Sequence, residues 1–122
     1  MAILLYPELS YKIMGVLFSV HNQLGPGFME KHYQRGIENE FMKQGIKYLS
    51  QVETKIEGIG AFRLDFLVND LIVVEIKATP RISRDDYQQI KRYLKLMDKE
   101  LGILATFGRR NLIYRRILKG YK

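Results

Sequence analysis

The sequence predicts a single α/β domain in which a mixed β-sheet is flanked by helices. Two helical segments precede a group of strands, and a further helix and two strands follow. Strand segments at 63–68, 73–78 and 101–107 are rich in apolar residues at both parities, which is typical of strands covered on both faces. The segment at 101–107 follows a helical crossover, so we expect it to run parallel to its neighbour. The 122 residues suffice for one domain, 1–122.

The first half of the chain is expected to begin with two helices. Ser10 is a candidate N-cap for a helix that continues to Leu24 and is followed by a Gly-Pro-Gly sequence. Its apolar stripe contains Ile13, Leu17, Val20 and Leu24. A second helix is expected from about Phe28 to Gln44, with Gly45 in the C-terminal cap position.

Short strands and one capped helix make up the rest. Asn69 and Asp70 indicate a turn between the two strongest strands, and Ser83 is a candidate N-cap followed by two acidic residues that complement the helix dipole. The expected elements are, in order, strands at 46–48, 51–56, 63–68 and 73–78, a helix from 83 to about 97, and strands at 101–107 and 111–117.

Three charged residues within the central strands form a candidate site. Glu75 and Lys77 share a face because side chains alternate along a strand, about 7 Å apart at this spacing. With Asp65 on the neighbouring strand, they could hold a hard divalent cation and leave an ammonium beside a water molecule, which suits phosphodiester hydrolysis. An ordinary solvated sheet face is the alternative, but apolar neighbours at both parities favour burial.

The hairpin register decides whether the two acids meet. A two-residue turn would place Asp65 and Glu75 on opposite faces of the sheet. A metal site requires one face, so we predict an odd-length connection at 69–71, with Val68 opposite Ile72.

Composition limits the choice of metal and of compartment. The chain has no cysteine, so a metal would be held by oxygen or histidine ligands, which favours magnesium, manganese or calcium. The stretch from Met1 to Glu8 is too short an apolar run for a signal peptide, and no apolar run reaches membrane-spanning length. We expect a cytoplasmic protein with no membrane partner.

The positive charge is concentrated in the second half of the chain. The net charge is +7, and residues 1–61 carry six basic and six acidic residues while residues 62–122 carry fourteen and seven. A basic region beside a carboxylate cluster suits a polyanionic partner, although a purely solubilising charge is the alternative. Arg109 and Arg110 are the basic residues of this half that we select as candidate nucleic-acid contacts.

The start of the second helix carries a recognisable motif. Glu30 and Tyr33 lie on one helix face, where Glu30 could also serve only to complement the helix dipole. The segment 27–33, Gly-Phe-Met-Glu-Lys-His-Tyr, resembles the signature of the GxxExxY protein family, a branch of the PD-(D/E)XK nuclease superfamily. The resemblance extends to Val20-His21, Leu24 to Gly27, Arg63 to Asp65, Val74 to Ala78, Gln89 with Tyr93-Leu94, and Thr106 to Gly108.

This resemblance covers roughly Ser10 to Ile117 and implies a restriction-endonuclease-like fold with a set of site residues. It implies that Glu30, Asp65 and Glu75 ligate Mg²⁺, with the carbonyl of Ile76 as a further ligand, and that Lys77 orients or deprotonates the attacking water. Thr106 is a departure, since relatives often carry a polar amide there.

The roles of four polar or aromatic residues are less clearly defined by the sequence. Gln89 is a candidate catalytic residue that could reach a phosphate or a water, while Tyr33 and Tyr93 are candidate nucleic-acid contacts. Tyr93 also fits the apolar stripe of its helix, and His21 fits a core position better than a site.

The function expected from the sequence is Mg²⁺-dependent hydrolysis of phosphodiester bonds in DNA, with Mn²⁺ as a second usable ion. Two alternatives remain: a nucleic-acid-binding module that cleaves nothing, and a nuclease subunit that needs a partner, with a homodimer left open. The form of the nucleic acid and the choice between DNA and RNA also stay open.

Overall fold

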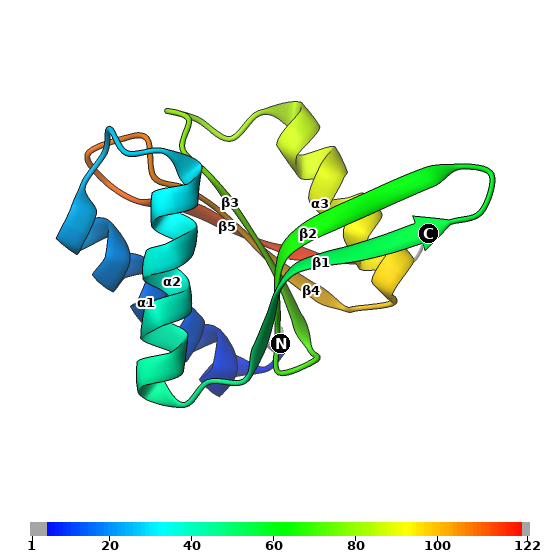
Figure 1. The fold of residues 1–122 in the computed structure, drawn as a ribbon, viewed down its shortest axis with the longest axis horizontal. Helices are drawn as coiled ribbons and strands as arrows, with labels where there is room; N and C mark the ends of the chain where they lie inside the picture. The colour runs from blue at the N-terminus through cyan, green and yellow to red at the C-terminus, as the bar shows by residue number, and fades with distance from the viewer. Residues whose placement is uncertain (1–4, 121–122) are drawn as a thin grey trace.

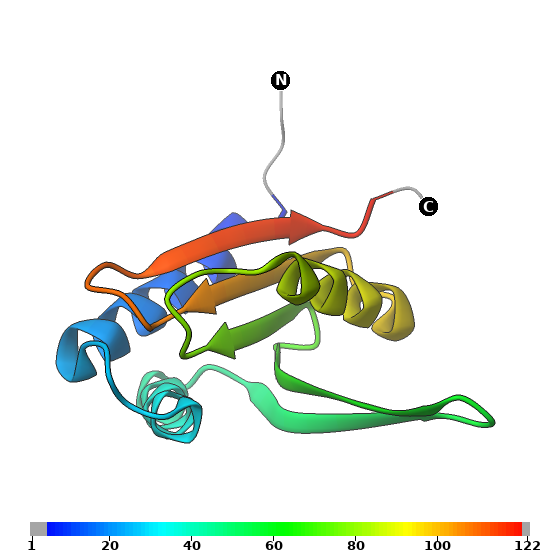
Figure 2. The same ribbon diagram turned by 90° about the horizontal axis from the view of Figure 1, so that it is seen from above.

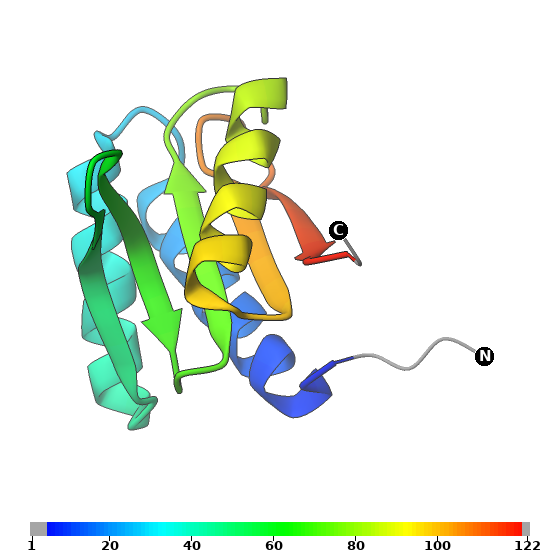
Figure 3. The same ribbon diagram turned by 90° about the vertical axis from the view of Figure 1, so that its right-hand side faces the viewer.

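The computed structural model describes residues 5–120. Outside this range lie Met1 to Leu4, which begin the stretch considered above as a signal peptide, and the basic residue Lys122. One β-sheet lies between two layers of helices (Figure 1). Figure 3 shows α3 on one face of the sheet and α1 and α2 on the other. The predicted restriction-endonuclease-like α/β class, a mixed sheet flanked by helices, is confirmed.

The sheet is mixed, as expected. The elements are α1 (Pro7–Leu24), α2 (Glu30–Gln44), β1 (Tyr48–Ile56), β2 (Gly60–Val68), β3 (Ile72–Lys77), α3 (Arg84–Met97), β4 (Leu101–Thr106) and β5 (Ile113–Leu118). The strands lie in sequence order from β1 to β5. Only the β3–β4 pair, joined through α3, is parallel among the neighbouring strand pairs of the described residues, which confirms the crossover prediction.

The largest differences from the expected elements lie at the start of the first helix and in the first two strands. The first helix begins at Pro7, with Tyr6 in the cap position, because proline is tolerated in the first turn, where its missing N–H has no helical acceptor. Ser10 is therefore a buried residue inside the helix instead of its N-cap. The two short strands expected at 46–48 and 51–56 form the single strand β1, which pairs with an equally long β2 in a hairpin that projects beyond the rest of the sheet (Figure 2).

Apolar side chains fill both layers. Phe66 and Val74 belong to the cluster under α1 and α2, while Leu67 and Val73 belong to the cluster under α3, as alternation along the strands requires. His21 is buried in the first layer, where its Nε2–H donates to the carbonyl of Arg109 over 2.8 Å, so the core reading of this histidine is confirmed. No helix within residues 5–120 is long and apolar enough to cross a membrane.

The β2–β3 hairpin has the predicted register. Val68 is opposite Ile72, and residues 69–71 form the connection. Asn69 and Asp70 have positive φ values of 50° and 59°, a conformation that these two residue types tolerate better than most. The register brings Asp65 and Glu75 to adjacent positions on neighbouring strands.

Gly108 allows a close backbone approach beside the end of β3. A Cβ atom at this position would lie 2.3 Å from both the carbonyl carbon and oxygen of Thr79. Because these are backbone atoms, Gly108→Ala should lower the free energy of unfolding by about 1–3 kcal/mol in urea denaturation. Gly15→Ala is the matched control: that site in α1 is open, so alanine should stabilise the protein by about 0.5–1 kcal/mol. Equal stability of the two variants would contradict this packing account.

Candidate active site

The candidate site lies where β2 separates from β3. Backbone pairing between these strands runs from Val68–Ile72 to Phe66–Val74. Beyond these pairs, hydrogen bonds between side chains and backbone connect the two strands. The backbone N–H of Asp65 donates to Glu75 Oε1 over 2.7 Å, and the N–H of Ile76 donates to Asp65 Oδ2 over 2.8 Å. Each carboxylate therefore binds the backbone of the opposite strand, which fixes the two acids side by side.

Burial makes this pair of acids costly to ionise. Glu75 is 2% exposed and Asp65 is half-buried. Desolvation, followed by the neighbouring Asp65, raises the pKa of Glu75 to about 9, and desolvation also raises the pKa of Asp65. Lys77 acts in the other direction on the pKa of both acids but does not cancel the effect. Without a bound cation, burial therefore favours the protonated form of Glu75 over its charged form.

Lys77 is held by residues of α3. Its Nζ donates to Gln89 Oε1 over 2.9 Å and lies 3.9 Å from Asp86 Oδ1. Gln89 Nε2 in turn donates to the hydroxyl of Tyr93 over 3.2 Å, and that hydroxyl donates to the carbonyl of Arg63 over 2.6 Å. A chain of hydrogen bonds thus connects the ammonium to the backbone of β2, two residues before Asp65.

Glu30 lies near Asp65 but belongs to α2, in the helical layer on the other face of the sheet from α3. It is the first residue of α2 and lines a pocket of about 290 Å³ together with Asp65, Gln34, Arg63, Lys31 and Gln51. Partial desolvation and then the charge of Asp65 raise the pKa of Glu30. Within residues 5–120, however, no three acidic or histidine side chains come close enough together to hold a metal ion. Glu30 therefore shares this pocket with Asp65 but does not form a three-acid cluster with the Asp65–Glu75 pair.

The donor set fits a hard divalent cation. Two buried carboxylates lie side by side, and the nearby ammonium of Lys77 already bonds to Gln89 and approaches Asp86. Such a site has an excess of negative charge that a cation bound by oxygen ligands would neutralise.

The candidate nucleic-acid contacts divide into exposed and buried residues. Arg109 and Arg110 are exposed in the loop after β4, at the same end of the parallel β3–β4 pair as Lys77. Tyr33 is fully buried, and its hydroxyl donates to the carbonyl of Gly25, so this structure gives it a packing role and no surface for a nucleic acid. Tyr93 is 5% exposed, and its hydroxyl is engaged with Gln89 and Arg63, which indicates a positioning role.

Two residues near the site were not predicted for it. Asp86 serves in the capping box of α3, where Oδ2 accepts from the Ser83 N–H, while Oδ1 faces Lys77. The sequence did contain a signal for Asp86: it precedes Gln89 by three residues, and residues at this spacing share a helix face. Thr106, the residue that departs from the family pattern, is fully buried and donates to the Thr79 carbonyl, which fixes the segment after β3.

The sequence matches the family model of the PD-(D/E)XK nuclease superfamily over residues 7–117, and the chain belongs to that superfamily. A search of curated proteins found no match.

A solved structure supports the fold alone. The crystal structure of SSO0001 is similar with a TM-score of 0.55 and 21% sequence identity, over 73% of this chain. The aligned part spans 49% of SSO0001, about half of its length.

Proposed function

We propose that the chain is a Mg²⁺-dependent nuclease that hydrolyses phosphodiester bonds in DNA, with Mn²⁺ as a second usable ion, and that it belongs to the GxxExxY branch of its superfamily. The observation that carries the proposal is the Asp65–Glu75 pair, in which each carboxylate binds the opposite strand beside Lys77. Membership in the nuclease superfamily supports the same reaction class.

Each residue has a separate role in this proposal. Asp65, Glu75 and the carbonyl of Ile76 would hold the cation, and Glu30 would complete the ligand set from the start of α2. When bound there, a divalent cation would supply positive charge against the scissile phosphate and would lower the pKa of a water molecule at the site. Lys77 would stabilise the developing negative charge on the attacking oxygen through its ammonium or, as the neutral amine, take up a proton from the attacking water. Its side chain lies on the same face of the sheet as Glu75.

The hydrogen bonds around Lys77 would determine its position. Gln89 accepts from the ammonium and is itself held by Tyr93, so it would place Nζ without contacting the reacting phosphate. Arg109 and Arg110, at the same end of the sheet, would bind phosphates that flank the scissile bond.

A second function is a nucleic-acid-binding module without cleavage, or a subunit that becomes active in a homodimer or with another partner. The observation that favours it is that, within the described part of the chain, no three acidic or histidine side chains gather as a metal site.

A cleavage panel separates these functions. Purified protein would be incubated with labelled duplex, single-stranded and branched DNA and with RNA, each with Mg²⁺ and with chelator. The nuclease proposal expects Mg²⁺-dependent products from at least one DNA. Binding of the same substrates in Ca²⁺ without cleavage in Mg²⁺ would instead favour the binding module.

A further inference from the structure

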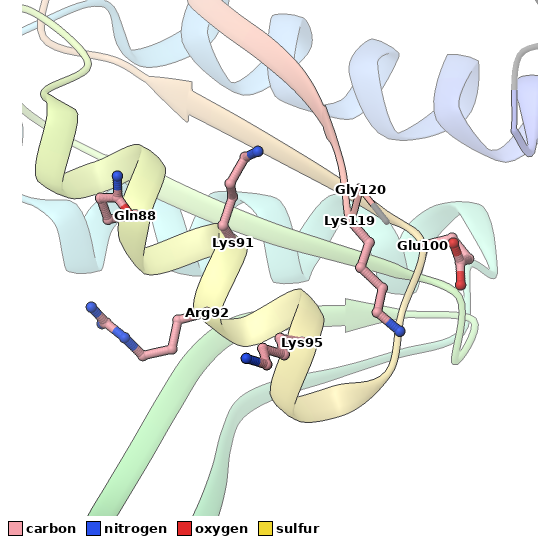
Figure 4. Close-up of a pocket in the computed structure, with 7 residues that line it drawn as sticks. All are labelled: Gln88, Lys91, Arg92, Lys95, Glu100, Lys119 and Gly120. Carbon is pink, nitrogen blue, oxygen red and sulfur yellow. The ribbon is translucent and has the colours of Figure 1, made fainter. Parts of the chain in front are cut away.

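A basic groove lies between α3 and the end of β5, outside the candidate active site. Figure 4 shows α3 along one side of the groove and Lys119 with Gly120 on the other. The groove has a volume of about 840 Å³ and is lined by Gln88, Lys91, Arg92, Lys95, Glu100, Lys119 and Gly120. The four α3 residues follow the spacing i, i+3, i+4, i+7, so they form one stripe along the helix.

The charge of this groove is only partly compensated. Lys119 pairs with Asp98, and Glu100 is the acid among the lining residues. Lys91, Arg92 and Lys95 are exposed, and none of the ion pairs found within residues 5–120 includes them. Four cations against Glu100 and Asp98 leave a net charge of +2. Exposed lysines on a helix often serve solubility alone, but here they line a concave surface, where positive potential is concentrated.

The same helix connects this groove with the candidate active site. Asp86 and Gln89 hold Lys77 from one side of α3, while the basic stripe follows an adjacent side. From residue 88 to residue 95 the stripe extends about 10 Å along the helix axis. That length corresponds to the axial rise of about three nucleotides in one DNA strand. A strand cleaved beside Lys77 could therefore continue around α3 and place successive phosphates along the stripe.

We propose that this groove binds the phosphate backbone of the DNA substrate away from the scissile bond. The inference rests on the proposed function for the choice of DNA as the polyanion. Lys91, Arg92 and Lys95 supply the charge, and Gln88 adds a neutral hydrogen-bonding group. Because such contacts involve phosphates, they add affinity without selecting a base sequence.

The test compares two triple variants in DNA binding. Lys91→Gln, Arg92→Gln and Lys95→Gln together remove the uncompensated charge from the groove, while Lys12→Gln, Lys43→Gln and Lys47→Gln remove three exposed charges on the side of α1 and α2. Binding of a short fluorescent duplex would be measured in Ca²⁺, without Mg²⁺, across a salt series. We expect the groove variant to reduce the slope of log K against log salt by about 2–3, since each phosphate contact contributes about 0.9.

The outcomes separate this inference from the proposed function. The groove is supported if its variant loses slope and at least tenfold affinity in low salt while the control variant keeps wild-type values and both variants melt like the wild type. Unchanged binding by the groove variant overturns the inference and indicates an acidic protein partner or a purely solubilising surface, even if the wild type cleaves DNA in Mg²⁺. A wild type that never cleaves would overturn the nuclease proposal, while a reduced slope in the groove variant would still support the binding surface.

Discussion

Replacing Lys77 with alanine should abolish DNA cleavage, with a loss of about 10²–10⁴-fold in the single-turnover rate in Mg²⁺. The change removes the ammonium that Gln89 and Asp86 position beside Glu75 and leaves both acids of the Asp65–Glu75 pair in place. We expect Mg²⁺ to raise the melting temperature of the wild type, and the variant should retain this increase because it depends on the cation ligands. Both quantities would be measured on the same preparation.

Lys55→Ala is the matched control for this experiment. Lys55 lies in β1 and is exposed. It forms an ion pair with Glu53 of the same strand, and both of these side chains are exposed to solvent. Its replacement should leave both the cleavage rate and the Mg²⁺-dependent melting temperature unchanged. Cleavage by Lys77→Ala at the wild-type rate would remove Lys77 from the mechanism.

Without divalent ions, the protein should become less stable as the pH rises from about 4.5 to about 9. Burial and Asp65 raise the pKa of Glu75 from 4.5 to about 9, so the folded state binds more protons than the unfolded state in this range. The stabilising effect of that proton is complete below the lower value and is lost as the pH passes the higher one. Each pKa unit corresponds to about 1.4 kcal/mol, so the total loss should reach several kcal/mol.

Urea unfolding at a series of pH values in chelator would measure this loss. Glu75→Gln is neutral throughout and nearly equal in size, so its stability should vary much less with pH. Mg²⁺ should stabilise the wild type more at pH 8 than at pH 5, because the cation and the proton compete for the same carboxylates. A wild-type stability that stays constant between these pH values in chelator would contradict the buried acid pair.

Much of the fold could be predicted from local patterns. The parallel β3–β4 pair followed from the helical crossover, and the position of Asp65 next to Glu75 followed from the chemistry required of the hairpin register. The start of α1 was wrong because Ser10, a good cap residue, lies where Pro7 had already allowed the helix to begin. Local propensity does not decide between two acceptable starting points.

The environment of the site could be predicted only in part. Gln89 was selected from the sequence, but its contact with Lys77 and the hydrogen bond from Tyr93 to the Arg63 carbonyl depend on how α3 packs on the sheet. Tyr33 shares a helix face with Glu30, yet its ring is buried against Phe107 at a centroid distance of 4.5 Å. Spacing along a helix identifies a face but not the depth to which each residue on it is buried.

The most direct test of the central claim is cleavage of labelled DNA by the wild type and by Asp65→Asn, each in Mg²⁺ and in chelator. Asparagine keeps the size of the side chain but removes its charge, so the variant should fold and yet lose affinity for the cation. The account predicts products only from the wild type in Mg²⁺. Equal cleavage by the folded Asp65→Asn variant, or cleavage by the wild type that continues in chelator, would contradict it.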